Sequence, residues 1–235
     1  MAKTQQQSAK RKRAATDPID EVNQKSDDQF VKDHLRPSDL SWTSWTHPAS
    51  RATYSLALAG AGRLSGADLD ACYRLVEETS RADYEASTTG WRPAKKRAEM
   101  RSADLRYVLV RDAAGEGAAV RGFASLMPTY EEGEPVLYCY EIHLRPELQG
   151  TGLGRSLMAL LESTAAHTPP IQKVMLTCFL SNAKALGFYE SLGFAPDAIS
   201  PVPRRLRYGR KFVPDYVIMS KTVESRAGPP GIASS

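Results

Sequence analysis

The chain has 235 residues, of which 42% are hydrophobic and 25% charged, with a formal net charge of +4. These values are ordinary for one substantial globular domain with tails. No stretch approaches the roughly 20 apolar residues that a membrane span needs. No apolar run follows the basic N-terminus, so the sequence predicts neither a membrane protein nor a secretory signal.

Cysteine and histidine are too scattered to predict a metal site. Cys72, Cys139 and Cys178 lie far apart in apolar segments, and none belongs to a Cys-x-x-Cys pair. The four histidines show no ligand spacing either. The pattern is typical of free, packed thiols in a reducing compartment, and we expect no metal.

The positive charge lies mainly near the two ends of the chain. Basic residues without any acid crowd the first thirteen positions, and a second basic run extends from Arg204 to Lys211. We predict disordered tails at residues 1–18 and 223–235, which lack the apolar content for a core. The segment Lys10–Arg13 has the pattern of a nuclear-import signal and equally that of a solvated tail. We expect the second run to be solvated surface, with contact to a ligand phosphate or to nucleic acid as the alternatives.

Between the tails, the apolar residues alternate between helical and strand periods. The domain is placed at residues 51–222, with an N-terminal extension over 19–50 that packs on it. Hairpins followed by strand–loop–helix–strand–helix–strand predict an α/β fold, a mixed twisted sheet of about seven strands with helices on both faces. We predict helices over 19–35, 67–85, 94–100, 154–167 and 181–192, and strands over 53–58, 105–111, 120–127, 136–144, 173–180 and 212–220, with a short strand after Phe194.

A glycine-rich loop, Gln149-Gly150-Thr151-Gly152-Leu153-Gly154, follows the strand over 136–144 and precedes an amphipathic helix. Backbone that wraps a phosphate must approach closely with its N–H groups inward, and the helix that follows adds the positive end of its dipole. A Rossmann site needs three spaced glycines after a first strand and an acid about 20 residues on, and a Walker loop needs Gly-Lys-Ser/Thr. Neither fits, so the loop alone indicates a phosphate site or a structural turn.

A second motif separates these alternatives. Gln149-x-x-Gly152-x-Gly154 resembles the acetyl-CoA motif of the GNAT superfamily, and the segment Asn182–Phe194 resembles the helix and strand that close that site. The two motifs in this order are more specific than either alone. The resemblance covers Thr53–Thr222 and implies the GNAT fold and acetyl-CoA as co-substrate.

Further segments resemble the histone N-terminal acetyltransferases called NatD. They are residues 136–142, 173–177, 84–85, 90–91 and 97–100. The resemblance implies acetylation of the α-amine of histones 2A and 4, whose mature tails begin Ser-Gly-Arg-Gly. It also implies a monomer without an auxiliary subunit, present in nucleus and cytoplasm, with no direct nucleic-acid binding. The alternatives are a GNAT enzyme that acetylates lysine or a small amine, and a non-catalytic chromatin-binding module.

Acetyl transfer needs a neutral amine and a proton donor for the leaving thiolate. We expect Glu141 to be the base, acting through a water, with a pKa raised by its apolar and aromatic neighbours. The matching Glu of NatD enzymes is at the catalytic centre; the alternative is a structural Glu paired with a cation. Tyr189 stands where many GNAT enzymes place the tyrosine that protonates the thiolate, but packing alone is an equal alternative.

The resemblance and the splayed strands of the fold also imply cofactor contacts. The backbone of Ile142 and Leu144 is expected to bond the pantetheine amides, and Asn182 is expected to bind the CoA arm or to cap its helix. The full set is Ile142, His143, Leu144, Gln149, Gly150, Thr151, Gly152, Leu153, Gly154 and Asn182.

On the peptide side, an acidic stretch beside aromatic residues suits a short basic tail. No Lys or Arg occurs between Arg121 and Arg145, and Glu131 is expected to pair with the substrate arginine. Thr129 and Thr89 depart from the acid and the Trp that the resemblance implies, which leaves the exact peptide specificity open. The matching positions that line the peptide groove are Tyr84, Trp91, Glu131, Tyr138, Tyr140 and Tyr216.

Overall fold

The computed structural model describes residues 16–35, 42–113, 118–205, 207 and 211–224. The helices are α1 (Pro18–Asn23), α2 (Asp27–Asp33), α3 (Gly66–Ala86), α4 (Pro93–Glu99), α5 (Leu153–Ala166) and α6 (Ala183–Ser191). The strands are β1 (Ser44–Thr46), β2 (Thr53–Gly60), β3 (Arg106–Asp112), β4 (Val120–Glu131), β5 (Glu134–Leu144), β6 (Lys173–Phe179), β7 (Ala195–Pro196), β8 (Arg204–Arg205), β9 (Lys211–Phe212) and β10 (Tyr216–Thr222).

Eight of these strands form one mixed sheet in the order β1-β2-β3-β4-β5-β6-β10-β7. All neighbours pair antiparallel except β5 and β6, which are parallel and joined through α5. A parallel pair needs such a crossover. The predicted α/β class and mixed sheet are therefore confirmed.

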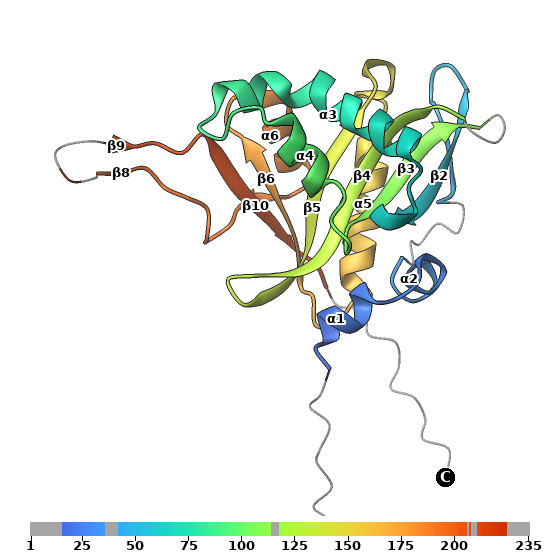
Figure 1. The fold of residues 1–235 in the computed structure, drawn as a ribbon, viewed down its shortest axis with the longest axis horizontal. Coiled ribbons are helices and arrows are strands. Elements are labelled where there is room, and N and C mark those ends of the chain that lie inside the picture. Colours follow the sequence, from blue (N-terminus) through green and yellow to red (C-terminus); the bar gives the residue numbers. More distant parts are fainter. Residues whose placement is uncertain (1–15, 36–41, 114–117, 206, 208–210, 225–235) are drawn as a thin grey trace, which may run out of the picture.

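Helices cover both faces of the sheet (Figure 1). Side chains alternate along a strand, so β3 contributes to a hydrophobic core on each face of the sheet. Val108 and Val110 belong to the core with α1, α2, α5 and α6, whereas Tyr107 and Leu109 belong to the core with α3 and Met100. Leu157, Met158 and Leu161 of α5 are fully buried in the first core. The sheet is thus clamped between α5 on one face and α3 with α4 on the other.

The segment predicted as one helix over 19–35 is two helices. Ser26 begins α2 because its side chain accepts a hydrogen bond from the backbone N–H of Gln29, and an extended serine at this position caps a helix and interrupts the one before it. Phe30 is fully buried, and the Arg106 guanidinium lies 4.2 Å from its ring centroid. Arg106 also donates to the carbonyls of Asn23 and Lys25, which ties both helices to the sheet.

The last predicted strand, over 212–220, begins later than expected. Phe212 pairs instead with Arg204 in the separate ribbon of β8 and β9. Pro214 follows, and a residue without an N–H cannot continue a ladder, so β10 starts at Tyr216. The short strand β1, which pairs with β2, was not predicted.

Several predictions concern residues that the structure describes only in part. Residues 1–15, with the Lys10–Arg13 pattern, and residues 225–235 lie outside the described residues, as does Arg210 of the second basic run. Arg204, Arg205, Arg207 and Lys211 are exposed. Among the described helices none is long and apolar enough to cross a membrane.

Candidate active site

The sheet opens where β5 and β6 part. Their ladder covers only Leu137–Cys139 against Val174–Leu176, yet β5 continues to Leu144 and β6 to Phe179. Beyond the ladder a cavity of about 970 Å³ lies between the two strands, α3, α4, α6 and the glycine-rich loop. This volume is at the upper end of those that hold cofactors and substrates.

Most of the predicted site residues meet in this cavity. It is lined by Tyr84, Glu131, Tyr138, Tyr140, Glu141, Ile142, His143, Leu144, Gln149, Gly150, Gly152, Gly154, Asn182 and Tyr189. Four predicted residues do not line it: Trp91, Thr151, Leu153 and Tyr216. Leu153 is fully buried in the core under the loop, and the Thr151 hydroxyl donates to the Leu148 carbonyl at 2.6 Å.

The glycines of the loop have separate structural reasons. Gly152 has a φ of 95° and precedes the first residue of α5, where its left-handed backbone favours glycine. Gly154 packs closely against Phe188 of α6. A Cβ at this position would stand only 3.3 Å from Phe188 Cζ, so a larger residue would crowd the ring. The first turn of α5 therefore faces the cavity with free N–H groups and the positive end of the helix dipole.

Gln149 fixes the loop to its surroundings on two sides. Its Nε2 donates to the Leu144 carbonyl at 3.0 Å, and its Oε1 accepts from Lys184 Nζ at 2.7 Å. Lys184 and Arg155 both line the cavity beside the loop. These two cations were not predicted, although Arg155 directly follows Gly154 and Lys184 lies within the Asn182–Phe194 motif.

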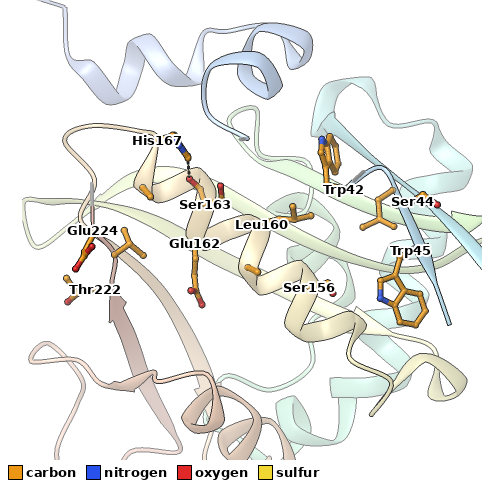
Figure 2. Close-up of a pocket in the computed structure, with 14 residues that line it drawn as sticks. Trp42, Ser44, Trp45, Ser156, Leu160, Glu162, Ser163, His167, Thr222 and Glu224 are labelled. Carbon is orange, nitrogen blue, oxygen red and sulfur yellow. Dashed lines mark hydrogen bonds between the residues drawn. The ribbon is translucent and has the colours of Figure 1, made fainter. Parts of the chain in front are cut away.

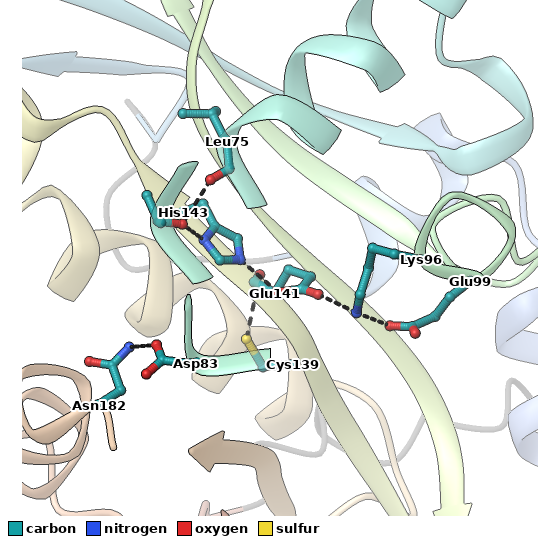
Figure 3. Close-up of polar contacts among 9 residues, drawn as sticks. Leu75, Asp83, Lys96, Glu99, Cys139, Glu141, His143 and Asn182 are labelled. Atoms are coloured by element: carbon teal, nitrogen blue, oxygen red, sulfur yellow. Dashed lines mark hydrogen bonds and ion pairs between the residues drawn. The ribbon is translucent and has the colours of Figure 1, made fainter. Parts of the chain in front are cut away.

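Glu141 is the centre of a buried polar network (Figure 3). Its Oε1 lies 2.9 Å from Lys96 Nζ, and its Oε2 lies 2.6 Å from His143 Nε2. Lys96 also contacts Glu99 Oε1 at 2.7 Å. The side chains of Lys96, His143 and Glu141 are only 6%, 8% and 10% exposed, so these groups lie largely away from water.

The expected direction of the Glu141 pKa is wrong. Burial raises it, but the hydrogen bond from His143 and the charge of Lys96 outweigh burial and lower the pKa to about 2. The carboxylate is thus ionised at neutral pH. The predicted flanking residue Ile142 is partly buried against the core that contains α5.

The role of Lys96 was not predicted from the sequence, because α4 and β5 are far apart along the chain and come together only in the folded structure. Burial alone would lower its pKa, but the neighbouring Glu141, Tyr84 and Glu99 raise it above the ordinary value. Its ammonium also lies 4.8 Å from the Tyr84 ring centroid. Lys96 is therefore a fixed cation in the wall of the cavity.

Tyr189, on α6, reaches the same cavity. Its side chain is largely buried, which raises its pKa well above the ordinary value, and nearby acidic groups act in the same direction. The phenol is neutral at physiological pH and retains a proton to donate.

Asn182 caps α6, as one of its two predicted roles requires. Its Oδ1 accepts from the Ala185 N–H at 3.0 Å, and its Nδ2 donates to Asp83 at 3.2 Å. Ser181 donates to the same carboxylate. Asp83 thereby connects α3 to α6 across one end of the cavity.

Aromatic side chains line the cavity where β5 begins. The rings of Tyr138 and Tyr140 are 5.0 Å apart, and the Tyr138 hydroxyl lies 2.6 Å from Thr177 Oγ1. Trp91 supports this wall from behind, since its ring lies 5.4 Å from that of Tyr84. Tyr216 pairs with Phe179 in the sheet and does not line the cavity.

A second hollow, of about 550 Å³, lies over α5 (Figure 2). Trp42 and Trp45 stand on one side of it and Thr222 and Glu224 on the other. Two of its polar side chains are engaged: Glu162 accepts from Lys221, and His167 contacts the Ser163 carbonyl. Its described lining has no glycine loop, so the cavity at β5 remains the candidate site. Nor do His, Cys, Asp and Glu form a metal-binding group of three among the described residues.

This arrangement of loop, splayed strands and closing helix defines an acyltransferase of the GNAT class, and comparisons agree. Residues 69–194, more than half of the chain, match the Acetyltransferase (GNAT) family. The chain belongs to this family, whose members use acetyl-CoA.

Two known proteins illustrate the similarity. The chain is 35% identical over 170 residues to N-alpha-acetyltransferase 40 of Saccharomyces cerevisiae, in an alignment that covers 60% of this chain and 58% of that protein. The match thus spans little more than half of the relative's length. The structure of Arabidopsis thaliana NAA60 with a bisubstrate analogue superposes with a TM-score of 0.51 at 10% identity, covering 73% of this chain and 99% of that one. This second likeness concerns the fold alone.

Proposed function

We propose that the chain transfers the acetyl group of acetyl-CoA to the N-terminal α-amine of proteins that begin Ser-Gly-Arg-Gly, histones 2A and 4 among them. The family supports acetyl transfer, and the printed name of the 35% identical relative supports the N-terminal amine. The observation that carries the proposal is the position of Glu141. It is an ionised carboxylate in the cavity, next to an aromatic wall and where the two strands part.

The loop end of the cavity suits the cofactor. The N–H groups before α5, with Arg155 and Lys184 beside them, offer positive potential for phosphates. The unpaired edge of β5 offers the backbone of Ile142 and Leu144 to the pantetheine amides, since the β5–β6 ladder ends at Cys139. Acetyl-CoA bound here supplies the acetyl group as a thioester.

The opposite end of the cavity suits a basic peptide. β5 is 11 residues long, so at about 3.3 Å per residue its ends lie roughly 30 Å apart. Glu131 precedes β5 and the glycine loop follows it, so the acid and the phosphate site are at different ends. Glu131 is placed to pair with the substrate arginine, and Tyr138 and Tyr140 to enclose the small residues.

The amine meets the acetyl group near Glu141. A free α-amine has a pKa of about 7.7–8.0, so a large fraction is already neutral near pH 8. The Glu141 carboxylate accepts a hydrogen bond from the amine, directly or through water, and orients it. Tyr189 donates a proton to the leaving thiolate.

The broader biology follows from the same proposal. A tail substrate reaches an open cavity without a further subunit, so we propose a monomeric enzyme without an auxiliary chain. Histone tails as substrates place it in the nucleus and, before assembly, in the cytoplasm. Direct binding of nucleic acid is not part of the proposal.

The test is acetylation of a Ser-Gly-Arg-Gly peptide, followed by thiol release and mass spectrometry. A free N-terminus is expected to be acetylated and the same peptide with a blocked N-terminus is not. Glu131→Gln is expected to raise KM for this peptide without raising KM for a Ser-Gly-Ala-Gly control. Transfer only to lysine or to small amines would replace the proposal with the second enzymatic alternative. Peptide binding without thiol release would support a non-catalytic module.

A further inference from the structure

The network at Glu141 continues past His143 to a hydroxyl that lines the cavity. Thr79 Oγ1 on α3 lies 2.5 Å from His143 Nδ1 and 2.8 Å from the Leu75 carbonyl oxygen. His143 Nε2 faces Glu141 on its other side at 2.6 Å. Thr79, His143 and Glu141 therefore form a line of three groups, and all three reach the cavity wall.

Counting protons along this line gives two complete arrangements. A threonine hydroxyl has one proton to donate and can also accept. With neutral His143, Nε2–H donates to the Glu141 carboxylate and the Thr79 hydroxyl donates to Nδ1. With protonated His143, Nδ1–H donates to Thr79 Oγ1, and the hydroxyl turns to the Leu75 carbonyl. No buried donor faces another donor in either arrangement.

The surroundings oppose proton uptake at the Glu141 carboxylate. Lys96 occupies the second oxygen of Glu141, so protonating that oxygen would weaken a buried ion pair. Glu99 and Tyr84 are the other titratable groups against Lys96, and the Phe123 ring lies 5.5 Å from the imidazole centroid on the β4 side. The described charges thus hold Glu141 anionic, and its Oε2 accepts the Nε2–H of His143 in both arrangements.

We infer that His143 accepts the proton that the acceptor amine loses, and that the Thr79 hydroxyl carries it there from the cavity. This inference rests on the proposed acetyl transfer and assigns its proton path. As the amine nitrogen bonds to the acetyl carbon, its proton passes to Thr79 Oγ1, directly or through one water, while the Thr79 proton moves to Nδ1. The C–S bond breaks, and Tyr189 protonates the thiolate. His143 then releases its proton to water, and Tyr189 takes one up from water.

The path gives Glu141 a role different from that of a base. It holds the Nε2–H in place and stabilises the imidazolium, as a carboxylate does behind a histidine in other proton-transfer sites. Imidazole ordinarily titrates between pH 5 and 8, just below an α-amine, which suits it to this exchange.

The test compares His143→Gln, Thr79→Val and Thr79→Ser by kcat across pH. Gln cannot titrate, and Val has the shape of Thr without a hydroxyl. His143→Gln and Thr79→Val are each expected to lower kcat by about 10²-fold, the usual loss of rate when a general base is removed. KM for acetyl-CoA and peptide should stay within a few-fold. The wild-type kcat is expected to fall at acid pH for two reasons: protonation of the amine removes its lone pair, and a second proton on His143 blocks the path. His143→Gln is expected to keep only the part of this fall that comes from the amine. Thr79→Ser restores the hydroxyl and should recover most of the rate.

Thr164→Val is the matched control. Like Thr79, Thr164 lies in a helix and donates to the carbonyl four residues earlier, here that of Leu160, at 2.8 Å. It is fully buried and does not line the cavity. Its loss should leave kcat unchanged. Wild-type kcat in both His143→Gln and Thr79→Val, with the acid limb of His143→Gln as steep as that of the wild type, would overturn the inference. If His143→Gln fails to fold, the Thr79→Val and Thr79→Ser pair decides. All variants are assayed on whichever amine the wild type acetylates, so a wrong acceptor class is recognised separately.

Discussion

At Glu141, burial and charge act on one carboxylate in opposite directions, and charge prevails. Two partners, Lys96 and His143, each occupy one oxygen of the carboxylate. A buried pair of this kind gives little net stability over an apolar pair, but removing one partner leaves a costly unpaired charge. The network is therefore better understood as a device that keeps Glu141 ionised in the cavity than as a source of stability.

The lowered pKa predicts a pH-dependent contribution to folding. Because the pKa falls from the ordinary 4.5 to about 2 on folding, the fold is more stable with Glu141 ionised than with Glu141 protonated. This difference is fully present above pH 4.5 and is lost as the pH drops through 2. Its size is on the order of 3 kcal/mol. In urea titrations from neutral pH to pH 2, Glu141→Gln should lose correspondingly less stability than the wild type.

Glu132→Gln is the control for this measurement, since Glu132 is an exposed carboxylate in the β4–β5 turn. Its unfolding free energy should follow the wild-type pH dependence. Parallel curves for the wild type and Glu141→Gln would show that Glu141 keeps an ordinary pKa when folded, which contradicts the network described above.

Among the elements, the junction of the glycine loop with α5 was the most predictable from sequence. Its signals are local: glycines where the backbone turns, then Leu157 and Leu161 at helical spacing. The α4–β5 contact was not predictable in this way, because Lys96 and Glu141 are 45 residues apart. One signal was available, since His143 lies two residues after Glu141 and side chains two apart share one face of a strand.

The strand ends show the same limit. β4 and β5 extend beyond their apolar residues, to Glu131 and Glu134. A tight turn at Glu132 and Gly133, with positive φ values of 48° and 84°, closes the hairpin and keeps the strand ends paired. Polar residues carry no strand period there, so the extension follows from pairing. This extension brings Glu131 to the cavity wall.

For the loop itself, Gly152→Ala tests the conformational requirement. A side chain at φ 95° is strained by roughly 1–2 kcal/mol, and relief of that strain would move the N–H groups that face the phosphates. We expect acetyl-CoA to bind about tenfold more weakly, or worse, by calorimetry.

Gly62→Ala serves as the comparison, because a Cβ at Gly62 meets no heavy atom within 4 Å and its φ is not positive. It should bind acetyl-CoA as the wild type does. Equal affinity in Gly152→Ala would mean that the left-handed turn has no part in holding the cofactor.

Over the whole molecule, the cavity receives side chains from both faces of the sheet. The core that contains α1, α2 and α5 lies on one face and includes Tyr189, whereas α3 and α4 bring Thr79 and Lys96 to the cavity from the other. The N-terminal segment also contacts β4: Asn23 donates to the Pro128 carbonyl, and the Tyr130 hydroxyl donates to Asp17. Asp17 and Asn23 thus support the β4–β5 hairpin that carries Glu131.

The amine that reaches Glu141 decides the reaction that the protein catalyses. A single peptide, Ser-Gly-Arg-Gly-Lys, offers an α-amine and a lysine ε-amine to the same enzyme in the same solution. The peptide is incubated with acetyl-CoA, and the early product is analysed by tandem mass spectrometry. We expect the acetyl group on the serine α-amine in large excess, and loss of that product in Glu141→Gln. Acetyl mainly on the lysine, or an undiminished rate in Glu141→Gln, would contradict this expectation.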